Sequence, residues 1–313
     1  MNDPASLVTA CVDAEVVSTE RLSGGASADL WSVRARTPDG VDHRWVLRRA
    51  RGGAAGMSIG VEAEVATLRA AARHGVGVPR VLGATGDAYV MEELDGETLP
   101  GRLLHDERFA AARDSLLDEI ATTLAAIHSV PVDELALPTL SAAAQVEQLE
   151  QLHRSIAEPV PAFELALRWL RAHEPSPARS TLVHGDFRTG NLLVDESGLR
   201  AVLDWELGHL GDPWEDLGWF CAPAWRFGGD TAGGFGSREE LYAAYERAAG
   251  VPVDVERVRF WEILATLKWG VICQFQAHRH LSGQSRSIEL ATIGRRVSET
   301  EVDLLLLIDE EHP

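Results

Sequence analysis

The sequence predicts an α+β protein whose strands are concentrated near its start and whose remainder is mostly helical. Short β-prone segments separated by turn residues occur before Asp95, whereas apolar residues at helical spacing dominate after it. One strand hairpin interrupts the helical part between Thr181 and Trp205. We therefore expect two parts, a strand-rich region of residues 1–95 and a helical region of residues 96–313.

Composition excludes several classes of protein. The chain has 313 residues, and 29 Lys and Arg against 48 Asp and Glu give it a net charge of −19. Nucleic acids and anionic membranes need clustered cations, so neither is expected as a partner. No segment approaches the ~20 apolar residues of a membrane-spanning helix, and the first residues do not resemble a secretory leader. Three widely separated cysteines predict a reduced, cytoplasmic setting: Cys11, Cys221 and Cys273.

The strand-rich region is expected to form a sheet with one helix. A small-residue turn at residues 23–27 lies between two segments that can be strands, and Trp45 to Arg48 is short, apolar and β-prone. Val61 to Arg73 has apolar residues at helical spacing. Two further short strands follow, at Arg80 to Leu82 and Ala88 to Met91. The expected order is strand, strand, helix, strand, strand.

The helical region shows several amphipathic segments. An apolar stripe runs from Leu116 to Ile127, and helices are expected over 140–157, over 163–171 and from about Trp214 to the end. A glycine-rich stretch, Phe227 to Gly236, predicts a mobile loop.

The densest chemistry lies around the hairpin. Asp186 and Asn191 bracket one tight loop, and Asp204 returns on the paired strand, so three oxygen-bearing side chains can converge. Mg²⁺ takes hard oxygen ligands and keeps water or phosphate oxygens as the others. A carboxylate beside that metal can accept a proton from an attacking hydroxyl group. Arg188 would place a positive charge where a transferring phosphoryl group develops negative charge.

The pattern His-Gly-Asp-x-x-x-x-Asn, followed by Asp-Trp-Glu, is similar to the catalytic and metal-binding segments of the aminoglycoside phosphotransferase and choline kinase-like family. These are small-molecule kinases with a two-lobed protein-kinase-like fold. The sequence most resembles the branch of this family that is fused to acyl-CoA dehydrogenases. The similarity lies in Leu-Arg-Arg at residues 47–49, His-Gly-Asp-Phe-Arg at 184–188 and Leu-Asp-Trp-Glu at 203–206. The resemblance covers Leu22 to Gly218. It implies that Asp186 is the catalytic base and that Asn191 and Asp204 are Mg²⁺ ligands.

The resemblance also implies a nucleotide site in the strand-rich region. The turn would approach the phosphates through the backbone of small residues, namely Ser23, Gly24, Gly25 and Ser27. Arg48 occupies the place of the strand lysine, whereas Arg49 should face the other way. Its partner is Glu64 or Glu62, which lie about 200° apart on the helix, and Glu64 matches the family's Glu-x-x-x-Leu stretch better.

Three more features follow from the resemblance. The linking segment would bind the nucleobase of ATP or GTP mainly through its backbone, at Met91, Glu92 and Leu94. Asp216 would anchor the backbone of the catalytic loop from below, whereas Asp212 is explained equally well as a helix N-cap. Glu206 could join the metal shell or meet the substrate.

We expect a Mg²⁺-dependent phosphotransferase that moves the γ-phosphate of ATP or GTP to a hydroxyl group of a small molecule. The alternative is a catalytically silent nucleotide-binding module, and a hydrolase built on His184 and Asp186 lacks further metal ligands. The acids show no cluster suited to polycationic aminoglycosides, and the dehydrogenase branch favours a hydroxylated, acyl-type metabolite. The sequence does not predict the oligomeric state. Six tryptophans of the final third could line the acceptor pocket or the core: Trp205, Trp214, Trp219, Trp225, Trp261 and Trp269.

Overall fold

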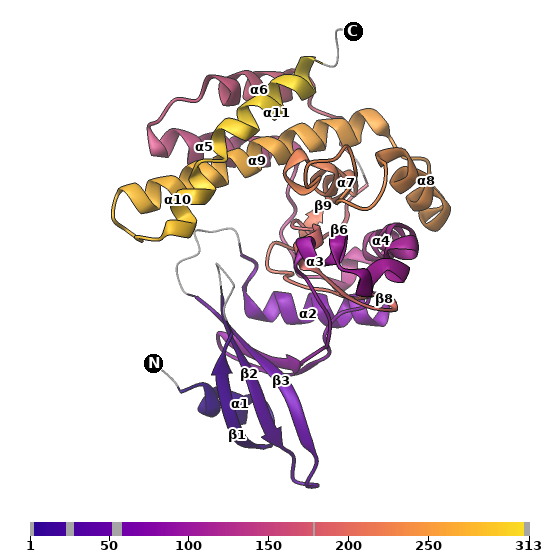
Figure 1. Cartoon of the computed structure of the whole chain (residues 1–313), viewed down its shortest axis with the longest axis vertical. Helices are drawn as coiled ribbons and strands as arrows, with labels where there is room; N and C mark the ends of the chain where they lie inside the picture. Colours follow the sequence, from indigo (N-terminus) through magenta and orange to yellow (C-terminus); the bar gives the residue numbers. More distant parts are fainter. Residues whose placement is uncertain (1–2, 23–27, 52–57, 178, 310–313) are drawn as a thin grey trace.

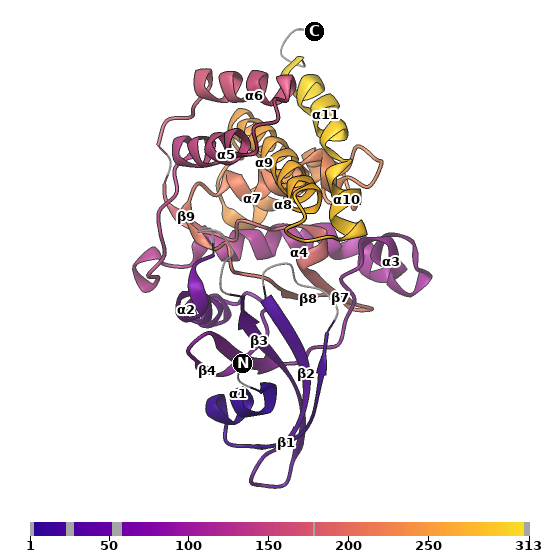
Figure 2. The same ribbon diagram turned by 90° about the vertical axis from the view of Figure 1, so that its left-hand side faces the viewer.

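The computed structural model describes residues 3–22, 28–51, 58–177 and 179–309. Figure 1 shows the sheet at one end of the molecule and a group of long helices at the other. Figure 2, a quarter turn away, shows the same arrangement, with the hairpin of β7 (Leu192–Asp195) and β8 (Gly198–Val202) between the two ends. None of the helices in the described ranges is both long and apolar enough to cross a membrane.

The first region is a five-stranded antiparallel sheet in the order β1-β2-β3-β5-β4. Its helix α2 lies between β3 and β4 in the sequence, and a further helix, α1, precedes the sheet. The elements are α1 (Pro4–Cys11), β1 (Glu15–Arg21), β2 (Ala28–Arg36), β3 (Asp42–Ala50), α2 (Gly60–Arg73), β4 (Val81–Thr85) and β5 (Ala88–Glu92).

The expected order of this region was incomplete in two respects. Three strands precede α2 instead of two, and helix α1 was not expected at all. Only eight residues long, α1 has a weak periodic signal, but Leu7 and Val8 are buried against one face of the sheet beside Trp45 and Leu47. Packing against the sheet therefore stabilises a helix too short to be stable alone.

The second region is helical, with four short strands around the loop of residues 184–191, for which the sequence predicts a catalytic role and which is called the catalytic loop below. Its helices are α3 (Pro100–His105), α4 (Ala110–Ser129), α5 (Ala142–Ile156), α6 (Pro161–Ala172), α7 (Trp214–Cys221), α8 (Arg238–Ala249), α9 (Val255–Leu281), α10 (Ile288–Gly294) and α11 (Val297–Asp309). Its strands pair as β6 (Thr181–Val183) with β9 (His209–Gly211), and β7 (Leu192–Asp195) with β8 (Gly198–Val202). The predicted helices and the predicted hairpin are therefore present. Helix α9 is the longest, and α5, α6, α7, α10 and α11 pack around it.

The two regions meet at the hairpin. The chain leaves the sheet after β5, and Glu97 then exchanges two backbone hydrogen bonds with Val194 of β7, at 2.8 and 3.0 Å. The backbone N–H of Val202 in β8 donates to Gly77, which follows α2. One apolar cluster includes side chains from α2, α4 and the hairpin, so the sheet region is packed directly against the catalytic segment.

The glycine-rich stretch is a loop between α7 and α8, as predicted. Ala232 is completely buried, and the Thr189 hydroxyl of the catalytic loop donates to the Gly233 carbonyl at 2.7 Å. The mobility of the stretch stays a prediction, but these contacts hold its centre against the catalytic loop.

Candidate active site

The catalytic loop connects β6 to β7 and is anchored from below by Asp216 of α7. The backbone N–H groups of His184 and Gly185 donate to the two carboxylate oxygens of Asp216, at 2.8 and 3.0 Å. Gly185 has a φ of +79°, and a Cβ there would lie 2.6 Å from the Leu207 carbonyl oxygen, so only glycine fits. The predicted anchoring role of Asp216 is confirmed by this geometry.

Asp216 is fully buried and accepts a further hydrogen bond from His128 at 3.3 Å. Burial alone would raise the pKa of Asp216, but the hydrogen bond and charge of His128 outweigh it, so the pKa lies below its usual value. Asp212 does not share this task. Its carboxylate accepts the Trp214 N–H at the start of α7 and hydrogen bonds from Arg257 and Trp261 of α9.

His184 is a structural residue of the loop. Its Nδ1 accepts the backbone N–H of Asp186 at 3.2 Å, so the proton must lie on Nε2, which donates to the Leu203 carbonyl at 3.0 Å. Burial lowers the pKa of this imidazole and keeps it neutral. Both ring nitrogens are occupied by backbone groups, which argues against a hydrolase that uses His184 as its base.

The Asp186 carboxylate is held by three donors, two from its own loop and one from α7. Asn191 Nδ2 donates to Oδ2 at 2.7 Å, Arg188 Nε lies 3.2 Å from Oδ1, and Trp219 Nε1 of α7 donates to Oδ1 at 2.9 Å. The side chain is 17% exposed, so it can meet a ligand. A carboxylate that accepts three hydrogen bonds in this way has a fixed orientation.

Asp204 lies two residues after the end of β8 and has an unusual backbone conformation, with a φ of +63°. Its side chain is 41% exposed and lies 3.6 Å from the Arg48 guanidinium. Desolvation, followed by the charge of Glu206, raises the pKa of Asp204 to about 6, although the Arg48 charge opposes this. The backbone N–H of Leu203 donates to the Asn191 carbonyl oxygen at 2.8 Å. The two predicted metal ligands, Asn191 and Asp204, therefore lie on neighbouring chain segments.

The oxygen groups at this place fit Mg²⁺. Asn191 uses its NH₂ group for Asp186, which leaves its side-chain carbonyl oxygen as an acceptor, and Asp204 adds a carboxylate. Across the described ranges, no three His, Cys, Asp or Glu side chains form a group that could hold a metal by themselves. A cation at Asn191 and Asp204 would therefore need water or phosphate oxygens, which is the coordination that Mg²⁺ commonly keeps.

Arg48 lies at the junction of the sheet and the catalytic hairpin. Its guanidinium donates to Glu64 of α2 at 2.8 Å and to Glu206 at 2.6 Å, and the Tyr89 hydroxyl donates to Glu64 at 3.1 Å. Burial raises the pKa of Glu64 to about 7, more than the Arg48 charge lowers it.

These contacts decide which glutamate pairs with Arg48 and which of the two arginines, Arg48 or Arg49, faces the site. Glu64 is buried against Arg48, whereas Glu62 is exposed. Arg49 points away and pairs with Asp87 at 2.8 Å. The structure thus brings Arg48, Glu64, Asp204 and Glu206 together.

The segment that links the two regions, with Met91, Glu92 and Leu94, has few side-chain contacts with the residues around Arg48. Met91 lies on β5 opposite Val46 of β3, and it packs against the core that contains α2. The Glu92 side chain turns away and accepts the Arg80 N–H at 2.9 Å. Leu94 is half-buried in the irregular segment after β5. The predicted phosphate-loop residues, Ser23, Gly24, Gly25 and Ser27, lie outside the described residues.

Sequence reasoning left some contacts of the site unassigned. Glu206 was noted in the Asp-Trp-Glu motif, but its pairing with Arg48 depends on how the two regions pack. Trp219 was one of six tryptophans, and no spacing distinguishes it. Three of the six lie in a row beside the loop: Trp219 and Trp225 have ring centroids 5.6 Å apart, and Trp225 and Trp269 5.0 Å. Trp205 is instead buried against His184.

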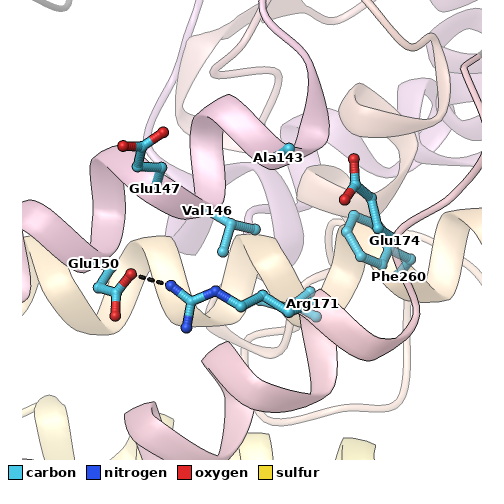
Figure 3. A pocket seen from close by; sticks show the side chains of 8 residues that line it. Ala143, Val146, Glu147, Glu150, Arg171, Glu174 and Phe260 are labelled. Atoms are coloured by element: carbon cyan, nitrogen blue, oxygen red, sulfur yellow. Dashed lines mark hydrogen bonds and ion pairs between the residues drawn. The ribbon is translucent and has the colours of Figure 1, made fainter.

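A cavity of about 350 Å³ lies elsewhere, between α5, α6 and α9. Figure 3 shows the Arg171 side chain reaching to Glu150, with Glu147 on the same helix as Glu150 and with Phe260 beside Glu174. None of the predicted site residues lines this cavity. The fold therefore separates it from the catalytic loop.

Residues 18–261 match the phosphotransferase enzyme family. The chain belongs to this family. It is 30% identical over 287 residues to mouse acyl-CoA dehydrogenase family member 10, a match that covers 82% of this chain and 26% of that protein. The phosphotransferase chain thus spans about a quarter of that curated relative. The expected similarity to the dehydrogenase-associated branch is confirmed.

Solved structures confirm the two-lobed kinase-like fold. A Ralstonia eutropha protein provisionally assigned as an aminoglycoside phosphotransferase superposes with a TM-score of 0.76 at 23% identity, covering 98% of this chain and 97% of its own. A spectinomycin phosphotransferase in complex with ADP and spectinomycin gives a TM-score of 0.66 at 12% identity, covering 97% of each chain. At these identities the likeness shows the fold of the phosphotransferase and not its substrate.

Proposed function

We propose that this phosphotransferase is a Mg²⁺-dependent kinase that transfers the γ-phosphate of ATP or GTP to a hydroxyl group of a small molecule. The observation that carries the proposal is the orientation of the Asp186 carboxylate, which Asn191, Arg188 and Trp219 hold beside Asp204. The Asp186 charge contributes to the raised pKa of Asp204, as expected for two carboxylates in one site.

Each residue has a role in the proposed transfer. Asp186 accepts the proton of the attacking hydroxyl group while the hydroxyl oxygen forms a bond to the γ-phosphorus. The bond between that phosphorus and the oxygen that bridges it to the β-phosphate breaks, which releases ADP or GDP. Arg188 offsets negative charge on the transferring group. Asn191 and Asp204 would hold Mg²⁺, which supplies neutralisation of the phosphate charge.

The nucleotide would lie between the two regions, residues 1–95 and 96–313. Arg48, held by Glu64, supports the proposal because it presents a fixed cation next to Asp204. We assign the phosphate-covering role to residues 23–27 and the nucleobase contacts to the segment of Met91, Glu92 and Leu94, by analogy with kinases of this fold.

The acceptor is proposed to be a hydroxylated metabolite of the acyl type. The similarity to an acyl-CoA dehydrogenase family member supports this class by analogy. We place the activity in the cytoplasm, since all three cysteines are free.

One observation favours the alternative of a catalytically silent nucleotide-binding module. The Arg48 guanidinium is already engaged by Glu64 and Glu206, so a nucleotide must share it with two carboxylates. The intact set of Asp186, Asn191 and Asp204 favours catalysis instead.

Thermal unfolding with Mg-ATP, Mg-GTP and metal-free ATP tests the nucleotide site. A ligand at a hundredfold its dissociation constant adds about 2.7 kcal/mol to the free energy of unfolding. We expect a magnesium-dependent shift that Asp204→Ala loses and that Asp118→Ala, an exposed acid on α4, keeps. No shift with either nucleotide would contradict the proposal.

Turnover then separates the kinase from the silent module. Asp186→Ala should still bind Mg-ATP but lose transfer to a panel of hydroxyl compounds, by a factor of at least about 10². An active Asp186→Ala variant would refute the assignment of the base. Binding without turnover in the wild type would favour the silent module.

A further inference from the structure

Lys268 is the single lysine in the chain, since the other 28 of the 29 Lys and Arg residues are arginines. It lies in the middle of α9 and is half-buried. It belongs to none of the motifs around the catalytic hairpin. A chain that uses arginine for every other cation therefore has its one primary amine side chain next to the catalytic loop.

The Lys268 ammonium holds the peptide group that precedes Asp186. Its Nζ donates to the Gly185 carbonyl oxygen at 3.0 Å. The N–H of the same peptide group belongs to Asp186 and donates to His184 Nδ1 at 3.2 Å. The orientation of this peptide is thus fixed at both ends, by Lys268 on one side and His184 on the other.

The same ammonium also supports the Asp186 side chain. Nζ lies 4.7 Å from the centroid of the Trp219 ring, within the range of a cation–π contact. Trp219 in turn donates from Nε1 to Asp186 Oδ1 at 2.9 Å, and it is only 4% exposed. Lys268 therefore contacts both the backbone and the side-chain support of one carboxylate.

Lysine suits this place better than arginine does. An ammonium is compact and has three donors around one atom, so it can bond a carbonyl oxygen and face a ring at the same time. A guanidinium is planar and larger, and its donors point in fixed directions within that plane.

We propose that Lys268 is a positioning residue that sets the orientation of Asp186 for phosphoryl transfer, through the Gly185 carbonyl and the Trp219 ring. This inference rests on the proposed function. A displacement of a reacting group by about 1 Å can lower the reaction rate on the order of a hundredfold. Loss of Lys268 should therefore reduce kcat and leave nucleotide binding nearly intact.

The activity test compares Lys268→Met with wild type and with His278→Gln, an exposed residue on the same helix. The readout is slow transfer of the γ-phosphate of Mg-ATP to water, which needs no identified acceptor. We expect Lys268→Met to lower kcat by about ten- to a hundredfold, with KM for Mg-ATP within about twofold of wild type. His278→Gln should match wild type.

A spectroscopic test reads the contact itself. In the tag-free chain, lysine labelled with ¹³C at its ε carbon gives a single side-chain resonance. We expect its ε-methylene protons upfield of their free-lysine position, because the adjacent Nζ lies 4.7 Å from the centroid of the Trp219 ring, and we expect Trp219→Leu to abolish that displacement.

The outcomes are distinguishable. Wild-type kcat in Lys268→Met, or an ε-methylene resonance at the free-lysine position, would refute the inference and leave the kinase assignment standing. An equal loss of kcat and of Mg-ATP affinity would also refute it, because that pattern indicates general disruption. A wild type that neither binds nor hydrolyses Mg-ATP would refute the proposed function and the inference with it.

Discussion

Arg48 of β3 and Glu206, which follows the catalytic hairpin, form an ion pair across the two regions, with Nη2 and Oε2 2.6 Å apart. The Arg48 side chain is 6% exposed and the Glu206 side chain 15%, so water screens the pair little. The neighbouring backbone reinforces this contact, since the Ile59 N–H donates to the Glu206 carbonyl at 3.0 Å. The cation that we assign to the nucleotide phosphates thus also joins the sheet to the catalytic segment.

Glu206→Gln should tighten the binding of Mg-ATP. The carboxylate competes with phosphate oxygens for Arg48, and its removal also takes a negative charge away from Asp204. We expect the dissociation constant of Mg-ATP to fall about fivefold, which corresponds to about 1 kcal/mol. Isothermal titration measures this, with Glu62→Gln, exposed on α2, as the matched control. Weaker binding of both Mg²⁺ and ATP would instead make Glu206 a metal ligand.

Trp219→Phe should lower turnover without weakening nucleotide binding. The substitution keeps an aromatic ring but removes the Nε1–H that donates to Asp186. A hydrogen bond to a charged group contributes about 1.5–3 kcal/mol, so kcat should fall about tenfold or more. Trp225→Phe is the control, because the Trp225 indole N–H is buried and has no partner among the described residues. Equal effects of the two substitutions on kcat would contradict the role of Trp219.

The contribution of His184 to the stability of the protein should decrease as the pH falls below about 6.5. Burial holds the pKa of this imidazole below its usual value of about 6.5, so below that pH the unfolded chain binds a proton that the folded chain does not. This contribution is fully present above pH 6.5 and falls by up to about 1.4 kcal/mol per pH unit below it. Glu64 and Asp204, whose pKa values are raised to about 7 and about 6, change the stability in the opposite direction over the same window.

Chemical denaturation between pH 5 and 7.5 measures this slope. His184→Gln should remove the His184 contribution, so that lowering the pH reduces the stability of this variant less than that of the wild type. Phe187→Leu, which alters a buried ring packed on His184, should destabilise the protein but keep the slope. An unchanged slope in His184→Gln would show that other groups cause the pH dependence.

Gly83→Ala should destabilise the sheet region. A methyl group at Gly83 of β4 would collide with the backbone carbonyl of Cys11, where α1 ends against the sheet. We expect a loss of about 1–3 kcal/mol in the free energy of unfolding, because neither backbone can yield without a shift of α1. Gly101→Ala in α3 has open space around it and should be neutral or slightly stabilising. Equal stabilities of the two variants would show that α1 is not docked as described.

The sequence by itself determined which predicted site residues meet at the hairpin and the types of the main elements of the fold. Asp186, Asn191 and Asp204 are close in sequence, and the hairpin between them is fixed by local turn residues, so their proximity could be inferred without the fold. The choice of Glu64 over Glu62, and of Arg48 over Arg49, could likewise be favoured from family spacing and from strand alternation.

Only the tertiary structure decided the contacts that join distant segments. Helix α1 is stable because the sheet covers Leu7 and Val8, which no local pattern reveals. Glu206 meets Arg48 from 158 positions away, and Trp219 and Lys268 reach the catalytic loop from α7 and α9. Such pairings depend on how the sheet, the hairpin and the two helices pack, because local periodicity assigns a residue to a helix face but not to the partner that this face meets.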